Sequence, residues 1–286
     1  MSRSVQIFHH NGLAIEYSII GEGTPILVMH GGHSNCYEEF GYRVLVEHGY
    51  SLITPSRAGY GHTSKELGAS LATACQAYIA LLDHLQLEKV HLLAVSAGGP
   101  SGIYLASRYP ERFHTLTLQC AVTKQWLTPK DKEYKASRIL FRPTTEKYLW
   151  KLVRTLNNRF PRFLFKQMAP SFSRLTLAEI ERMMNQSDVE ELRKMNNRQR
   201  SGYGFVYDMA TPASISTEDL QTITSPTLII HSRHDATVPL EHPIHANQYI
   251  IDSELFLCET WGHLIWLGKG SELVDQKMIQ FLEKHP

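Results

Sequence analysis

The residues best suited to chemistry surround Ser96, in the stretch HLLAVSAGGPSG from His91 to Gly102. An apolar run ends on this serine, and the residues two before and two after it, Ala94 and Gly98, are small. This pattern is typical of a sharp strand-to-helix turn that exposes a nucleophilic side chain. Such a turn would also place the backbone amide of Ala97 at the start of a helix, where it can donate to a developing oxyanion.

A serine becomes a useful nucleophile when a base removes its proton and a carboxylate orients that base. Asp235 follows the apolar run TLIIHS, and His263 follows the run ELFLC. Taken singly, these residues have simpler explanations: a tight turn at Ser96, an Asx turn at Asp235 and a buried structural histidine at His263. Because all three follow apolar runs, and in the order Ser, Asp, His, together they predict a catalytic triad.

The apolar run ILVMH continues into GGHSN and supplies a second candidate oxyanion donor. We expect this donor to be the backbone amide of Gly32, because glycine permits a positive φ and a close approach to substrate. A plain glycine turn is the alternative. His30 is expected to brace the loop rather than to catalyse, and His33 is a candidate for the wall of a substrate pocket.

The elements needed to position these residues can be read from the apolar pattern. Strands are expected at residues 14–20, 26–30, 51–54, 91–96, 115–122, 227–232 and 254–258. Helices are expected at residues 71–85, 101–109, 244–250 and 271–284. Continuous apolar runs that alternate with amphipathic helices predict an α/β fold with a mostly parallel sheet covered on both faces.

The alternation stops between residues 124 and 212, where no clear strand pattern occurs. Helical patterns appear at residues 146–156 and 177–184, and several prolines separate such segments. Residues 124–200 contain 18 Lys and Arg against 8 Asp and Glu, although the whole chain has a net charge of only +1. We therefore predict a helical cap at 124–212, inserted into an α/β core formed by residues 1–123 and 213–286.

Seven aromatic residues of the predicted cap could cover an apolar pocket or form the cap's own core. They are Trp126, Phe141, Tyr148, Trp150, Phe160, Phe163 and Phe165. Trp126, together with His33, is the candidate for contact with a substrate.

Five motifs together resemble those of the α/β-hydrolase superfamily, particularly its capped members: MHGGHS, PSRAGYGHTS, AVSAGGP, HSRHDATVP and WGHLIW. The resemblance spans nearly the whole chain. It implies an eight-stranded, mostly parallel sheet with the cap after the sixth strand, and a triad of Ser96, Asp235 and His263. Two positions depart from the family pattern. Ala94 replaces the first glycine of the serine turn, and Ser56 replaces an aspartate that often anchors the loop after the fourth strand.

The expected function is hydrolysis of a small carboxylic ester or related acyl compound through an acyl-enzyme. A C–C bond hydrolase, a lactonase or an amidase could use the same triad. A protein of another class, a ligand receptor on a hydrolase scaffold, could also retain it. A small-molecule substrate is the expected partner.

Composition and motifs argue against several other classes. No run of eighteen apolar residues and no signal-peptide pattern occurs, and the four cysteines lack metal or disulfide spacing, so we expect a cytoplasmic protein without a membrane partner. No HExxH motif and no nucleotide-binding loop occurs, so we expect no metal and no cofactor. No recognised binding module accompanies the basic charge, so nucleic acid is not an expected partner.

Overall fold

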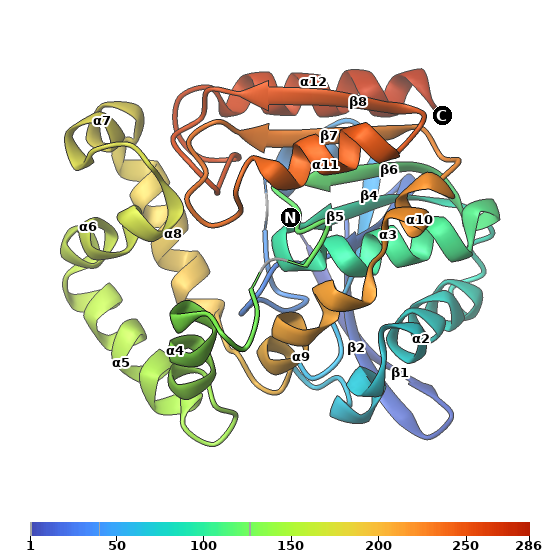
Figure 1. Ribbon diagram of the computed structural model, residues 1–286, viewed down its shortest axis with the longest axis horizontal. Helices are drawn as coiled ribbons and strands as arrows, with labels where there is room; N and C mark the ends of the chain where they lie inside the picture. Colours follow the sequence, from blue (N-terminus) through green and yellow to red (C-terminus); the bar gives the residue numbers. More distant parts are fainter. Residues whose placement is uncertain (1, 40, 126) are drawn as a thin grey trace.

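A computed structural model describes residues 2–39, 41–125 and 127–286 of the chain. Its centre is one eight-stranded sheet (Figure 1). The strands are β1 (Arg3–His10), β2 (Leu13–Ile20), β3 (Thr24–Met29), β4 (Tyr50–Pro55), β5 (Val90–Val95), β6 (Phe113–Gln119), β7 (Thr227–Ser232) and β8 (Ser253–Cys258).

The strand order across the sheet is β1-β2-β4-β3-β5-β6-β7-β8. The first two pairings, β1 with β2 and β2 with β4, are antiparallel, and all the others are parallel. The order reverses between β3 and β5, so the loops after these two strands leave the sheet side by side. Ligands of open α/β sheets bind at such a point, beyond the carboxyl ends of the strands.

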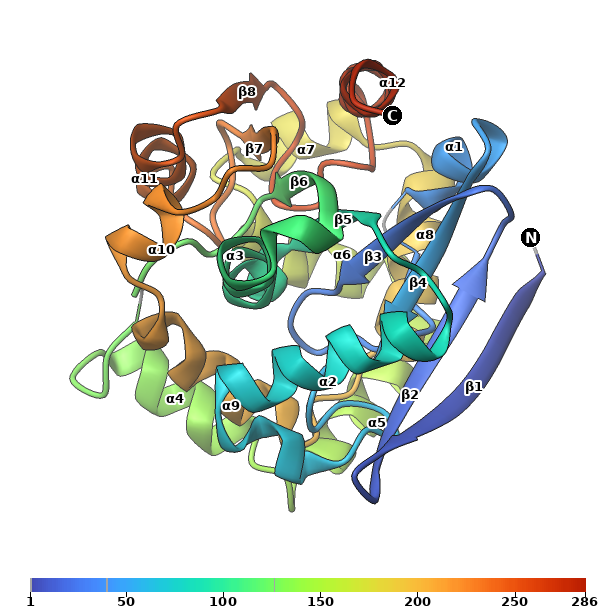
Figure 2. The same cartoon turned by 90° about the vertical axis from the view of Figure 1, so that its right-hand side faces the viewer.

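Helices cover both faces of the sheet (Figure 2). One face packs against α2 (Leu71–His84), α3 (Gly99–Arg108), α10 (Thr217–Gln221) and α11 (Glu241–Tyr249). The other face packs against α1 (Tyr42–Glu47) and α12 (Ser271–Lys284). Central strands β4 and β5 are buried along their whole length, which explains why their sequences are mainly apolar.

Between β6 and β7 the described residues form helices and no strand of the sheet, and we call α4–α9 the helical insert. Its members are α4 (Lys132–Leu140), α5 (Glu146–Arg159), α6 (Pro161–Phe172), α7 (Leu177–Met183), α8 (Gln186–Arg198) and α9 (Gly204–Ala210). Helices α4 to α8 lie beyond the end of the sheet toward which β7 and β8 point (Figure 1). The exact division of the chain at residues 123 and 212 stays a prediction.

The predicted α/β fold is confirmed, and most of the predicted elements occur within a few residues of their expected positions. Strand β1 was not predicted, because as an edge strand it lacks a buried apolar run. The predicted strand at 115–122 ends early, at Gln119, since Cys120 adopts a positive φ of 47°. Among the described helices, none combines the length and apolar character that crossing a membrane requires.

Candidate active site

Ser96 lies on the turn that joins β5 to α3, and its backbone is in the left-handed region, with φ of 52°. A non-glycine residue in this region is strained and persists only where the surroundings hold it. Here the Ser96 carbonyl accepts a hydrogen bond from Val122 N at 2.9 Å, directly after β6. The predicted serine turn therefore exists, and the neighbouring strand fixes its geometry.

The small residues around Ser96 are required by contacts with the adjoining strands. A Cβ on Gly98 would overlap the carbonyl oxygen of Met29 at the end of β3, and one on Gly99 would overlap that of Val122. Ala94, the departure from the family pattern, fits because the helix residue facing it is Gly102. Gly102, which lies about one helical turn after Gly98, thus leaves room for the methyl group of Ala94.

The structure brings Ser96, Asp235 and His263 together. The Ser96 hydroxyl lies 2.9 Å from Nε2 of His263, and Nδ1 of His263 lies 2.7 Å from Oδ2 of Asp235. Asp235 is fully buried, and His263 is 5% exposed. This chain of hydrogen bonds allows a proton to move from the serine to the imidazole while the carboxylate orients the ring.

Asp235 remains ionised although it is buried. Burial by itself raises the pKa of a carboxyl group, but the nearby His263, together with its hydrogen bond, outweighs this and leaves the pKa of Asp235 below its ordinary value. Its other oxygen, Oδ1, accepts from the backbone amides of Thr237 at 2.7 Å and Val238 at 2.8 Å. The carboxylate is therefore held in one orientation from two sides.

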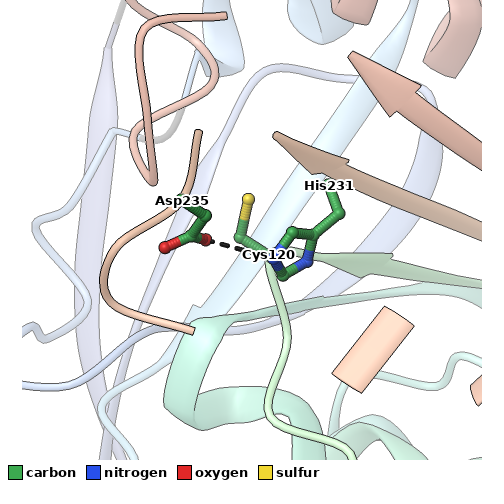
Figure 3. A group of neighbouring side chains, drawn as sticks. All are labelled: Cys120, His231 and Asp235. Carbon is green, nitrogen blue, oxygen red and sulfur yellow. Dashed lines mark ion pairs between the residues drawn. The ribbon is translucent and has the colours of Figure 1, made fainter. Parts of the chain in front are cut away.

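Cys120 and His231 lie directly beside Asp235 (Figure 3), and the ligand atoms of the three residues are within 4.8 Å of one another. Nε2 of His231 is 2.9 Å from the carbonyl oxygen of Val238 and 3.3 Å from Oδ2 of Asp235. Burial raises the pKa of the Cys120 thiol well above its usual range, so the thiol stays protonated and is a poor metal ligand. The arrangement supports Asp235 through His231 rather than offering a free cation site. The sequence analysis overlooked His231, whose only signal is a polar residue in an apolar strand.

The loop after β3 passes next to Ser96. A Cβ on Gly31 would lie 3.3 Å from the Ser96 Cβ, and one on Gly32 would lie 3.7 Å from the Ala97 Cβ. Gly32 does not adopt the positive φ that glycine permits, and the left-handed residue of this loop is His33, with φ of 58°. Gly32 instead leaves open the space beside Ala97, next to the serine.

A buried ion pair fixes this loop. The guanidinium of Arg57 contacts both carboxylate oxygens of Asp208, at 2.5 and 2.9 Å, and its Nε donates to the His30 carbonyl at 2.7 Å. The Arg57 amide donates to Nε2 of His30 at 2.9 Å, so His30 braces the loop, as expected. Asp208 belongs to α9, so the helical insert takes part in holding the loop. The sequence analysis did not single out either member of this pair.

The missing aspartate at Ser56 is compensated by Glu16 of β2. Ser56 Oγ donates to Oε2 of Glu16 at 2.7 Å and accepts from the Cys36 amide at 3.0 Å. Burial would raise the pKa of Glu16, but hydrogen bonds from His62 and Ser56 lower it below its ordinary value. Gly61 provides the space, because a Cβ there would overlap the Glu16 carboxylate. A carboxylate thus anchors the loop after all, from a neighbouring strand.

A cavity of about 330 Å³ opens above Ser96 and His263, between the sheet and the helical insert. Gly32, His33 and Ala97 line it together with residues of the insert, and most of its wall is apolar. Its lining includes Val95, Leu127, Phe141, Trp150, Met168, Phe172, Met195, Phe205, Met209, Leu264 and Trp266. The lining residues that the structure describes include no Lys or Arg, and the one acidic residue, Glu38, is paired with Arg198 at 2.7 Å.

The aromatic residues of the insert divide between the two roles considered for them. Phe141 and Trp150 line the cavity, whereas Phe165 packs with Trp261 in a separate apolar cluster. Tyr148, Phe160 and Phe163 are exposed. Trp126, the other proposed pocket residue, lies outside the described residues.

Helix α6 connects the insert to the loops that carry Asp235 and His263. The carbonyl oxygen of Phe172, its last residue, accepts from the amide of His263 at 2.9 Å and from that of Ala236 at 3.3 Å. Ser173 forms an isolated antiparallel bridge with Asp235. The end of α6 therefore contacts both loops and helps to hold them in place.

Comparison with known proteins agrees with the geometry. Residues 24–269 match the family described as the alpha/beta hydrolase fold. The chain is 58% identical over 283 residues to the "Uncharacterized hydrolase YcgS" of Bacillus subtilis (strain 168), covering 99% of this chain and all of that one.

More distant relatives extend the comparison. The chain is 23% identical to the 2-hydroxy-6-oxo-2,4-heptadienoate hydrolase of Pseudomonas putida F1, over 91% of this chain and 89% of that protein. Among solved structures, an alpha/beta hydrolase fold protein from Nakamurella multipartita matches with a TM-score of 0.82 and 26% identity, covering 98% of this chain and 99% of that chain.

Proposed function

The chain belongs to the α/β-hydrolase family, and from this premise we propose that it is a serine hydrolase that cleaves an uncharged carboxylic ester or lactone through an acyl-enzyme. The observation that carries the proposal is the continuous hydrogen-bonded path from the Ser96 hydroxyl through His263 to Asp235, at the floor of an apolar cavity.

In the proposed reaction, His263 accepts the Ser96 proton as the serine oxygen attacks the substrate carbonyl. Asp235 stabilises the imidazolium that forms, and the amides of Gly32 and Ala97 donate to the oxyanion. His263 then returns the proton to the leaving alcohol. Water, activated by the same histidine, hydrolyses the acyl-enzyme and regenerates the free serine.

The cavity supports an uncharged substrate. A carboxylate brought into an apolar cavity needs a cationic partner, because desolvation of an unpaired charge is costly. The described lining offers no such partner, and Glu38 is already paired. A neutral ester or lactone pays only a small desolvation cost when it enters this cavity.

A C–C bond hydrolase remains the second candidate, because one relative is named for a dienoate substrate. The dienoate of that name carries a carboxylate, and the described cavity wall lacks the cationic group that would bind one. The present chain therefore fits an ester or lactone better.

The test is steady-state hydrolysis of p-nitrophenyl esters of increasing acyl length. We expect repeated turnover, and we expect Ser96→Ala to lower kcat by about 10⁴-fold or more, because the nucleophile is lost. Asp235→Asn is the matched variant for orientation of the base, and it should lower kcat by about 10⁴-fold.

Two results would contradict the proposal. Turnover retained in Ser96→Ala would show that another group reacts. Tight binding of an ester with at most one slow turnover would instead support the receptor on a hydrolase scaffold.

A further inference from the structure

His33 is a polar residue of the cavity wall that has no role in the proposed reaction. It directly follows Gly32, lines the cavity and is enclosed by three aromatic rings. Its ring stacks on Phe205 with a centroid distance of 4.2 Å, and Phe141 and Trp150 lie at 4.3 and 5.3 Å. A polar ring so tightly enclosed has a fixed orientation.

The hydrogen bonds of Ser201 determine where the His33 proton lies. The Ser201 hydroxyl, which is fully buried, is 2.7 Å from Nε1 of Trp150 and 2.8 Å from Nδ1 of His33. An indole N–H can only donate, so Ser201 accepts from Trp150. The hydroxyl hydrogen then has Nδ1 of His33 as its available acceptor. Nδ1 is therefore unprotonated, and the neutral ring carries its hydrogen on Nε2.

The His33 ring stays neutral under ordinary conditions, since burial lowers its pKa to about 3. Its Nε2–H makes no hydrogen bond with any described residue, although the other ring nitrogen, the backbone amide and the carbonyl are all paired. The amide donates to the Tyr60 hydroxyl at 3.2 Å, and the carbonyl accepts from the Arg200 amide at 2.8 Å. The Nε2–H of His33 is thus left for a ligand.

We propose that His33, held by Ser201 and Trp150, is a substrate-binding subsite whose Nε2–H donates to a second oxygen of the substrate. The inference rests on the proposed function and narrows its substrate class. The substrate is an uncharged ester or lactone whose acyl part carries a further carbonyl oxygen. A neutral N–H donor suits such an oxygen, whereas a carboxylate would require the full charge that the described wall does not offer.

The first measurement is the ring tautomer of His33 by ¹⁵N NMR of histidine-labelled protein at pH 7, with the resonances assigned by their loss in His33→Asn. We expect protonated Nε2 and unprotonated Nδ1, and we expect Ser201→Ala to abolish this preference. A proton on Nδ1 in the unmodified protein would overturn the inference, and this result does not depend on turnover.

The second measurement compares p-nitrophenyl 5-oxohexanoate with p-nitrophenyl hexanoate. The ratio of their kcat/KM values should fall about five- to tenfold in His33→Phe, which keeps the ring but loses the donor. Comparing one ratio between two proteins cancels the intrinsic reactivity of each ester. Met209→Leu is the matched control, because it alters the apolar cavity wall but keeps the three aromatic rings around His33, and it should leave the ratio unaltered.

The outcomes separate the two proposals. An equal ratio in the unmodified protein and in His33→Phe, with turnover that still requires Ser96, would overturn the subsite and leave the serine hydrolase standing. A loss of rate shared by both esters would also overturn it, because a merely structural contact between His33 and the insert affects all substrates alike. If no ester is turned over, 5-oxohexanamide but not hexanamide should still shift the Nε2 resonance of His33. No such shift would overturn the subsite as well.

Discussion

The two walls of the cavity are built in different ways. The sheet side carries Ser96, Asp235 and His263 on loops that follow strands, and backbone atoms of Met29 and Val122 restrict the Ser96 turn to a narrow space. The side formed by the helical insert consists of amphipathic helices with many exposed residues, joined to the core by polar contacts such as Arg57–Asp208 and Arg198–Glu38. The turn that carries Ser96 is therefore fixed by the ends of adjoining strands, whereas the wall formed by the insert depends on individual long-range pairs.

The largest expected effect tests this dependence on single pairs. Asp208→Asn removes the partner of the buried Arg57 guanidinium, and we expect a loss of about 3–5 kcal/mol of unfolding free energy, because an uncompensated charge remains buried. Urea unfolding followed by circular dichroism measures it. The control is Glu191→Gln, which breaks the solvent-exposed pair with Lys194 and should leave stability unaltered. Equal losses of unfolding free energy in the two variants would contradict the larger contribution expected from the buried pair.

On the sheet side of the cavity, a single added methyl group should lower stability and turnover. In Gly98→Ala the new Cβ meets the Met29 carbonyl, so β3 and α3 must separate, and we expect a loss of about 1–3 kcal/mol together with reduced turnover. Gly12→Ala offers a matched control for the substitution itself, since no atom lies within 4 Å of the added Cβ, although its positive φ of 78° adds backbone strain. A Gly98→Ala protein as active and as stable as the original would show that the turn is not tightly constrained.

The protonation of His33 should contribute to the pH dependence of the free energy of unfolding. The pKa of His33 is about 3 in the folded protein and has a reference value of 6.5. Between these values the unfolded chain binds the extra proton, so stability falls as pH falls from 6.5 toward 3. We expect His33→Asn to reduce this slope by up to about 1.4 kcal/mol per pH unit. Unfolding in urea at several pH values between 4 and 7 measures the slope.

Other buried histidines remain in that variant, so its acid limb should flatten without vanishing. Burial also lowers the pKa of His242 to about 3 and that of His91 to about 4. An unaltered slope in His33→Asn would mean that the ring is already protonated in the folded protein, which contradicts its neutral role in the cavity.

The smallest effect belongs to the outer surface of the insert. Phe163 of α6 is 56% exposed, and we expect Phe163→Ser to change the free energy of unfolding by less than about 0.5 kcal/mol and to leave ester turnover intact. The same unfolding experiment and the p-nitrophenyl assay measure both. A large loss of unfolding free energy would indicate that this ring is buried in an assembly. The outer surface of the insert would then be as sensitive to substitution as the sheet side.

The sequence by itself determined the strands that precede the three candidate residues. The apolar runs of β5, β7 and β8 made Ser96, Asp235 and His263 recognisable from local patterns, and β5 and β7 are mainly apolar because they are buried along their whole length. The edge strand β1 was missed for the same reason, because its residues are mostly exposed and give no such pattern.

Only the tertiary structure decided which distant groups meet. Arg57 and Asp208 are 151 residues apart, His33 and Ser201 are 168 apart, and Glu16 replaces a missing aspartate from another strand. Local periodicity reports which face of an element is buried, but it carries no information on which polar groups pair across the fold. The pairs Arg57–Asp208 and His33–Ser201 position the loop beside Ser96 and leave the Nε2–H of His33 without a partner among the described residues, and these two pairs exist only once the insert has packed against the sheet.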